Sequence, residues 1–171
     1  MTEPIHDKIK RSLQAAEGLY HRLVLLVGET GSGKTGILRE IADDLDTSII
    51  NINLALSSEL LELTAKQRSR RLPEILSQIT DKYQSPVILD NLEILFDKDI
   101  KQDPLRLLHS ISRNRATVAS WSGAFIGGRL LYAQTGHPEY RSYDSVDALL
   151  VCMDGTATIE SEEGNKKAEQ A

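Results

Sequence analysis

The sequence has few of the residues that support disulfide bonds, metal clusters or membrane spans. Cys152 is the only cysteine among 171 residues, so no internal disulfide can form, and its apolar neighbours predict core packing rather than reactivity. The four histidines show no metal-ligand spacing. No apolar run is long enough to cross a bilayer, and the N-terminus lacks the apolar stretch of a signal peptide. We therefore expect a cytoplasmic protein without membrane contact.

Aromatic residues make up only 5 % of the chain, so Leu, Ile, Val and Ala must form most of the core. The length fits one domain. The formal net charge of −5 provides no general attraction to nucleic acid, so any DNA contact requires a local basic patch. We expect residues 1–155 to form the core, beginning with an amphipathic helix over 3–17, and the polar residues 156–171 to form a disordered tail.

One segment carries a strong chemical signal. Residues 28–35 read Gly-Glu-Thr-Gly-Ser-Gly-Lys-Thr and fit Gly-x-x-x-x-Gly-Lys-[Ser/Thr], the phosphate-binding loop (P-loop) of nucleotide hydrolases. An apolar strand over 23–27 precedes the loop and a helix over 34–45 follows it. Backbone N–H groups of such a loop surround phosphate, Lys34 reaches the β- and γ-phosphates, and Thr35 offers its hydroxyl to Mg²⁺. The predicted ligands are ATP or ADP with Mg²⁺, bound by Gly28, Glu29, Thr30, Gly31, Ser32, Gly33, Lys34, Thr35 and Gly36.

A second acidic position follows an apolar strand over residues 86–91. Asp90 ends its apolar run, and downstream of a phosphate loop such a carboxylate is expected to support Mg²⁺ together with Thr35. The alternative is an aspartate that only caps the turn after the strand. A strand over 48–53 without a terminal acid separates the loop helix from Asp90. This arrangement disfavours a small-molecule P-loop kinase.

The same order of elements resembles that of the additional-strand ATPases, such as the AAA+ and RecA-like groups. The resemblance implies a three-layer α/β P-loop fold with a parallel sheet. Its strand order would be 5-1-4-3-2, where strands 1 to 5 cover residues 23–27, 48–53, 86–91, 116–122 and 148–153. No helical lid domain is expected after the last strand, so oligomerisation or a partner would complete an open site.

Two residues after Asp90 are considered for the activation of water, Asn91 and Glu93. Many of these ATPases have glutamate after the metal-side aspartate, and here the residue is Asn91. An amide can position water but cannot accept its proton. Glu93 would project to the same side as Asn91 if the strand stayed extended, so Glu93 is the candidate base. The competing interpretation is weak hydrolysis, or hydrolysis that waits for a partner.

Further polar candidates lie later in the chain. Ser122 or Ser120, at the end of strand 116–122, is placed to sense the γ-phosphate, whereas Trp121 is expected to pack. Arg141 precedes the last strand, near where AAA+ rings carry an arginine that acts on the neighbouring subunit. Arg113 and Arg115 are the alternatives, and surface solubility is the competing explanation for each arginine. The basic cluster 66–71 is either a non-specific DNA contact or a solvated helix face.

Local signals predict the remaining elements. Ser57 and Ser58 are candidate caps for a helical region over 57–81, in which Pro73 predicts a start or a break. Asp103 and Pro104 predict the start of another helix. Gly127-Gly128 predicts a turn between strand 116–122 and a further strand over 129–133, and residues 135–144 are expected to form a loop.

Several stretches together resemble one family. Residues 89–97, 101–108, 112–115 and 136–140, with Asp90-Asn91-Leu92-Glu93 and Gly136-His137-Pro138-Glu139-Tyr140 as the most specific parts, are similar to the BrxF family. These are small P-loop proteins of type 3 BREX (bacteriophage exclusion) systems. The similarity covers residues 20–153 and implies antiphage defence beside a large ATPase and a DNA methyltransferase. Two interpretations stay open: an ATPase whose nucleotide state controls assembly on DNA, or a nucleotide-bound interaction module with little turnover.

Overall fold

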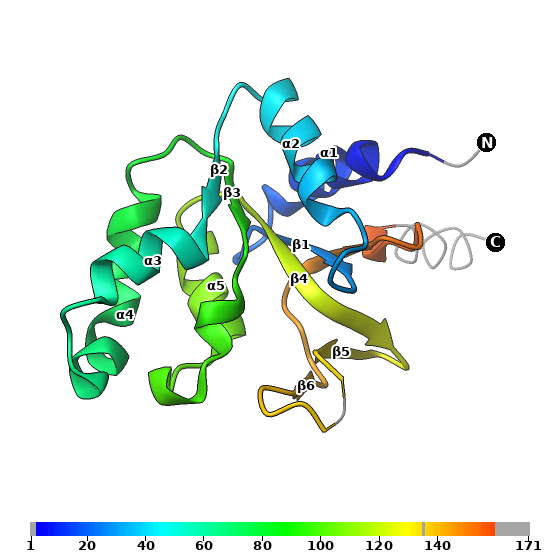
Figure 1. Cartoon of the computed structure of the whole chain (residues 1–171). Coiled ribbons are helices and arrows are strands. Elements are labelled where there is room, and N and C mark those ends of the chain that lie inside the picture. Colours follow the sequence, from blue (N-terminus) through cyan, green and yellow to red (C-terminus); the bar gives the residue numbers. More distant parts are fainter. Residues whose placement is uncertain (1–2, 135, 160–171) are drawn as a thin grey trace.

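Parallel strands form the centre of the fold in the computed structural model, which describes residues 3–134 and 136–159 (Figure 1). The strands are β1 (Leu23–Gly28), β2 (Ile49–Asn51), β3 (Val87–Asp90), β4 (Thr117–Ile126), β5 (Arg129–Tyr132), β6 (Arg141–Tyr143) and β7 (Leu149–Cys152). The helices are α1 (Ile5–Ala16), α2 (Lys34–Asp44), α3 (Ile52–Leu60), α4 (Ala65–Thr80) and α5 (Pro104–Ser112), with the 3-10 turns η1 (Glu93–Phe96) and η2 (Lys98–Ile100).

The sheet has the predicted strand order. Its parallel strands lie in the order β2-β3-β4-β1-β7, which is the expected 5-1-4-3-2 arrangement read from the other edge. Because all of these strands run in the same direction, β1 and β3 end at the same edge of the sheet. The phosphate loop after β1 and Asp90 at the end of β3 therefore meet at that edge. In the described part of the chain, no helical lid domain follows β7.

Side chains on the two faces of the buried strands belong to two separate layers of the core. In β1, Leu25 packs into the larger core with α3, α4 and α5, whereas its neighbour Leu26 packs into the smaller core with α1 and α2. Successive side chains of a strand point to opposite faces, so one strand supplies both cores. Figure 1 shows the two groups of helices on opposite sides of the sheet.

The helices between β2 and β3 begin at positions other than those predicted. β2 ends at Asn51, whose side chain accepts a hydrogen bond from Leu54 N and caps α3, so the strand is shorter than the predicted 48–53. Ser57 and Ser58 lie inside α3 and cap nothing. Thr64 caps α4 through a capping box. The prediction of Ser57 and Ser58 as caps was wrong because Asn51 already caps α3 before its first turn.

Pro73 lies inside α4, where a helix start or break was predicted. A proline has no N–H to donate to the carbonyl four residues earlier, which here belongs to Ser69. Gln102, from the segment before α5, donates to that carbonyl oxygen at a distance of 2.7 Å from its Nε2. The helix continues through Pro73 with this acceptor satisfied from outside.

β4 continues past the end of β1 and changes its partner. Up to Ser122 it pairs with β1, and from Gly123 to Ile126 it pairs with β5 in the predicted hairpin. A Cβ on Gly123 would lie 1.8 Å from the carbonyl oxygen of Leu131, so only glycine permits this approach. β6 pairs with β5 inside the stretch that was predicted to be a loop.

The segment after β7 turns back onto the sheet. Ala157 forms an isolated bridge with Val151, and the Thr158 hydroxyl accepts a hydrogen bond from Leu150 N at 3.1 Å. The side chain of Lys8, in α1, donates to the carbonyl oxygen of Gly155. Residues 156–159, assigned to the tail from the sequence, are thus in contact with the domain. The rest of that tail, residues 160–171, lies outside the described residues.

Candidate nucleotide-binding site

The phosphate loop leads from β1 directly into α2. Gly33 has φ of 98°, a left-handed conformation that favours glycine, and α2 begins at the next residue. No side chain of the described residues caps α2, so its first-turn N–H groups have no side-chain acceptor. The N-terminus of such a helix attracts anions through these N–H groups and through the helix dipole.

Lys34 is held inside this loop. Its side chain is buried, and Nζ donates to the carbonyl oxygens of Gly28 and Glu29, each at 2.7 Å. Burial lowers the pKa of Lys34, while the negative charges of Asp90, Glu93 and Glu29 oppose that shift. Phosphate oxygens offer the ammonium the same kind of acceptor with a full negative charge, so a bound polyphosphate compensates for the burial.

The metal-side residues contact each other directly. Thr35 Oγ1 donates to Asp90 Oδ2 at 2.7 Å, and Ser120 Oγ donates to Asp90 Oδ1 at 2.8 Å. Asp90 is 5 % exposed, so both of its oxygens are fixed in a largely buried place beside the loop. Hydroxyl and carboxylate oxygens are the ligands that Mg²⁺ prefers, and Thr35 and Asp90 therefore fit the predicted ion. When bound, the ion would neutralise phosphate charge.

The chain turns immediately after Asp90, so the extended geometry expected for Asn91 and Glu93 does not hold. Asn91 has φ of 55°, and Glu93 begins η1. Glu93 Oε2 accepts a hydrogen bond from Asn53 Nδ2 at 3.0 Å, and Asn53 Oδ1 accepts from Ile94 N at 2.8 Å. Asn53 thereby positions the carboxylate at this edge of the sheet.

Asn53 is a site residue that the sequence analysis did not single out. The available signal was its polarity, together with that of Asn51, in a segment predicted to be a central strand. In the structure, Asn51 caps α3 and Asn53 contacts Glu93.

The two serines of β4 lie at different positions. Ser120 contacts Asp90, whereas Ser122 is paired with Gly28 at the start of the phosphate loop. Trp121, between them, is 1 % exposed and packs edge-on against Phe96, as predicted. Its Nε1 donates to the carbonyl oxygen of Leu131 at 3.0 Å.

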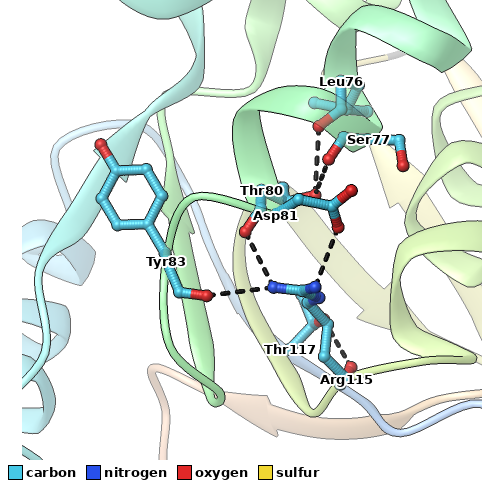
Figure 2. A network of polar contacts seen from close by, with 7 residues as sticks. All are labelled: Leu76, Ser77, Thr80, Asp81, Tyr83, Arg115 and Thr117. Atoms are coloured by element: carbon cyan, nitrogen blue, oxygen red, sulfur yellow. Dashed lines mark hydrogen bonds and ion pairs between the residues drawn. The ribbon is translucent and has the colours of Figure 1, made fainter.

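The candidate arginines all have contacts within their own chain. Arg141, in β6, donates from Nη2 to the carbonyl oxygen of Gln102 at 3.2 Å, and Arg113 lies 5.0 Å from the ring centroid of Tyr20. Arg115 donates to the carbonyl oxygens of Thr80 and Tyr83 and to the carboxylate of Asp81, as Figure 2 shows. Arg113 and Arg115 precede β4, so they lie at the edge of the sheet opposite the phosphate loop.

The basic cluster 66–71 lies in the first half of α4. Lys66, Arg70 and Arg71 are exposed, whereas Arg68 donates to the carbonyl oxygens of Leu63 and Leu61 and thereby supports the turn between α3 and α4. Part of the cluster therefore has a structural role. The exposed members keep both interpretations open, DNA contact and a solvated helix face.

The comparisons with known proteins agree with this geometry. Residues 24–117 match the family described as ATPase family associated with various cellular activities (AAA), a range that includes the phosphate loop and Asp90. The chain belongs to the AAA family. This AAA domain has the expected α/β fold with a parallel sheet, and its family supports P-loop nucleotide binding. Nothing in the comparisons concerns the narrower BrxF resemblance, which stays a prediction.

The chain is also similar, over part of its length, to a curated protein. The AAA domain is 27 % identical over 114 residues to a tRNA dimethylallyltransferase of Methylobacillus flagellatus, covering 66 % of this chain and 32 % of that protein. The chain thus spans about a third of the relative's length. No solved structure matched significantly.

None of the helices in residues 3–134 and 136–159 has the length and apolar character that crossing a membrane requires.

Proposed function

We propose that this AAA domain binds ATP or ADP with Mg²⁺ in the phosphate loop, and that it hydrolyses ATP as part of a bacterial antiphage complex of the BREX type. The observation that carries the nucleotide part is the contact between Thr35 and Asp90 beside the buried ammonium of Lys34. These groups offer an Mg²⁺-chelated polyphosphate a cation, metal ligands and helix N–H groups at one place.

In this proposal each residue of the site has a separate task. Lys34 and the loop N–H groups hold the phosphates, and Thr35 and Asp90 hold the ion. Glu93 accepts the proton of the attacking water, and Asn53 orients its carboxylate. Ser122 senses the γ-phosphate from β4.

The antiphage role is supported by the sequence resemblance alone. It implies that the domain acts in the cytoplasm with a large ATPase and a DNA methyltransferase, and that nucleotide state controls assembly or DNA association. We propose that the domain forms a homo-oligomer in which Arg141 reaches the nucleotide of the neighbouring subunit. The exposed residues of the 66–71 cluster would supply non-specific DNA contact.

A second candidate function is a nucleotide-bound interaction module with little turnover of its own. The position after Asp90 carries the left-handed Asn91, which cannot accept a proton, and Glu93 is already engaged by Asn53. Phosphate release separates the candidates. A module of this kind would bind Mg²⁺-ATP but release no phosphate, with or without partner proteins.

The deciding experiment combines calorimetry with light scattering on wild type and Lys34→Ala, each with Mg²⁺-ATP, Mg²⁺-ADP or no nucleotide. We expect wild type to bind nucleotide and to change its mass with it, and Lys34→Ala to bind about 10- to 100-fold more weakly, because a charged hydrogen-bond donor is lost. Lys98→Ala, which removes an exposed lysine, is the matched control. No binding by wild type at millimolar Mg²⁺-ATP would overturn the proposal.

A further inference from the structure

A cavity of about 300 Å³ lies near β1, the strand that leads into the phosphate loop. It is lined by Phe125, Leu150, Cys152, Thr156, Ala157 and Thr158. Phe125 comes from the part of β4 that pairs with β5, and the other residues come from β7 and the segment that turns back onto it. Its size is at the lower end of the range for small-molecule sites.

The two walls of this cavity flank the end of β1. On one side β4 pairs with β1 up to Ser122, opposite Gly28, and Phe125 follows on the same face as Trp121. On the other side Cys152 of β7 is paired with Val27. The cavity is therefore located at the carboxyl end of β1, where the phosphate loop begins, on the face of the sheet covered by α3, α4 and α5.

The order of the strands gives a bound nucleotide a direction. Asp90, at the metal end, belongs to β3, and the order across the sheet is β3-β4-β1-β7. Neighbouring strands are about 4.8 Å apart, so β3 and β7 are separated by about 14 Å. A nucleoside triphosphate with its terminal phosphate near Asp90 extends across the loop towards β7, the strand that lines the cavity.

The lining of the cavity fits a flat, uncharged group. None of the six residues carries a formal charge, so the cavity offers nothing to the phosphates. The ring of Phe125 is partly exposed and is available for stacking. The hydroxyl of Thr158 accepts from Leu150 N and keeps its own hydrogen to donate.

We propose that this cavity receives the aromatic base of the nucleotide, stacked on Phe125. The inference rests on the proposed nucleotide binding and adds a second half to the site. It assigns recognition of the base to the β4–β5 hairpin and to the segment after β7. In the described residues this segment is not followed by a helical lid domain.

The test compares Mg²⁺-ATP with Mg²⁺-tripolyphosphate, which has the phosphates but no base, by calorimetry. We expect Phe125→Ala to weaken ATP binding about tenfold, the effect of losing one base–aromatic stack, and to leave tripolyphosphate binding unchanged. Ile126→Ala is the matched control, because Ile126 is also exposed and adjacent but points to the other face of β4. Ile126→Ala should change the binding of neither ATP nor tripolyphosphate.

The lone cysteine provides a readout that needs no substitution. Bound ATP should slow alkylation of Cys152 in wild type, whereas tripolyphosphate should not. If ATP bound no more tightly than tripolyphosphate, or left Cys152 equally reactive, or if Phe125→Ala bound ATP as wild type does, the base site would be wrong while the proposed function stood. If wild type bound neither ligand, both proposals would fail.

Discussion

The side chains of Asn53 and Glu93 are hydrogen-bonded across 40 positions of the sequence, with Asn53 Nδ2 3.0 Å from Glu93 Oε2. The same asparagine uses its other polar atom to accept from Ile94 N. A single side chain at the start of α3 thus fixes both the first turn of η1 and the carboxylate at its beginning. The proposed catalytic base depends on a residue of a different element.

This contact leads to a prediction about turnover. Glu93→Gln should lower the rate of ATP hydrolysis by about 10²-fold or more, because an amide cannot accept the proton of water. Asn53→Asp keeps an acceptor for Ile94 N but places a like charge beside Glu93, so it should displace the carboxylate from the position that Asn53 gives it and also lower turnover. Phosphate release under saturating Mg²⁺-ATP measures both effects.

The control for this series is Asn91→Gly. Asn91 has φ of 55°, so glycine removes the amide without the strain that alanine would add. We expect Asn91→Gly to retain most of the wild-type rate. Equal rates in wild type and Glu93→Gln would remove Glu93 from the reaction, and a large loss in Asn91→Gly would assign the water to Asn91 instead.

The hydrogen bond from Ser120 to Asp90 predicts a loss of stability. Ser120→Ala removes the partner of Asp90 Oδ1, which is buried, and should lower the free energy of unfolding by about 1–3 kcal/mol. Urea denaturation at neutral pH measures it. Ser122→Ala, two residues on and less buried, is the control and should stay within about 0.5 kcal/mol of wild type. Equal stability of the two variants would contradict the role given to Ser120.

Substitution of Pro73 is predicted to increase stability. Pro73→Ala restores the missing N–H in the interior of α4 and should raise the free energy of unfolding by about 1–3 kcal/mol. Pro104→Ala is the matched control, because Pro104 occupies the first turn of α5, where proline is favoured. It should give no gain. A destabilised Pro73→Ala would mean that the contact from Gln102 to Ser69 depends on the proline.

A histidine pair near the amino ends of the strands predicts a pH dependence. His21 and His109 are stacked with ring centroids 4.5 Å apart; His21 contacts the Asp147 carboxylate, and His109 Nε2 donates to the Asp147 carbonyl oxygen. Burial lowers the pKa of His109, the charge of His21 lowers it further, and Asp147 and Asp103 oppose the shift.

Because the pKa of His109 is lower in the folded state, the unfolded chain binds a proton more readily. Stability is therefore complete above the ordinary histidine pKa of about 6.5 and falls as the pH drops below it. Urea unfolding of wild type at pH 7.5 and 5.5 should show this loss. His109→Gln should reduce the difference, and His137→Gln, in an exposed loop, should not.

The sequence predicted the parts of this fold that depend on local signals. The phosphate loop, the apolar strand before it, the helix after it and the helix start at Asp103 and Pro104 each occupy a short continuous stretch. The strand order was implied by the resemblance to the additional-strand ATPases, which rested on the strand that separates the loop helix from Asp90. These features need no knowledge of distant contacts.

The features that the sequence analysis missed depend on contacts between distant residues. α4 continues past Pro73 because Gln102, 33 residues away, satisfies the carbonyl of Ser69. β6 forms because it pairs with β5, and its own three residues carry no distinctive pattern. The position of Glu93 depends on the left-handed turn at Asn91 and on Asn53. None of these partners can be identified from spacing alone.

β4 connects both ends of the site in one uninterrupted strand, with Ser120 at Asp90 and Phe125 at the cavity. Side chains alternate along a strand, so inserting or deleting one residue between Ser122 and Phe125 would turn the phenyl ring to the opposite face. Asp90 and its contacts would be untouched by such a change. A change of length between Ser122 and Phe125 would therefore separate recognition of the base from binding of the phosphates.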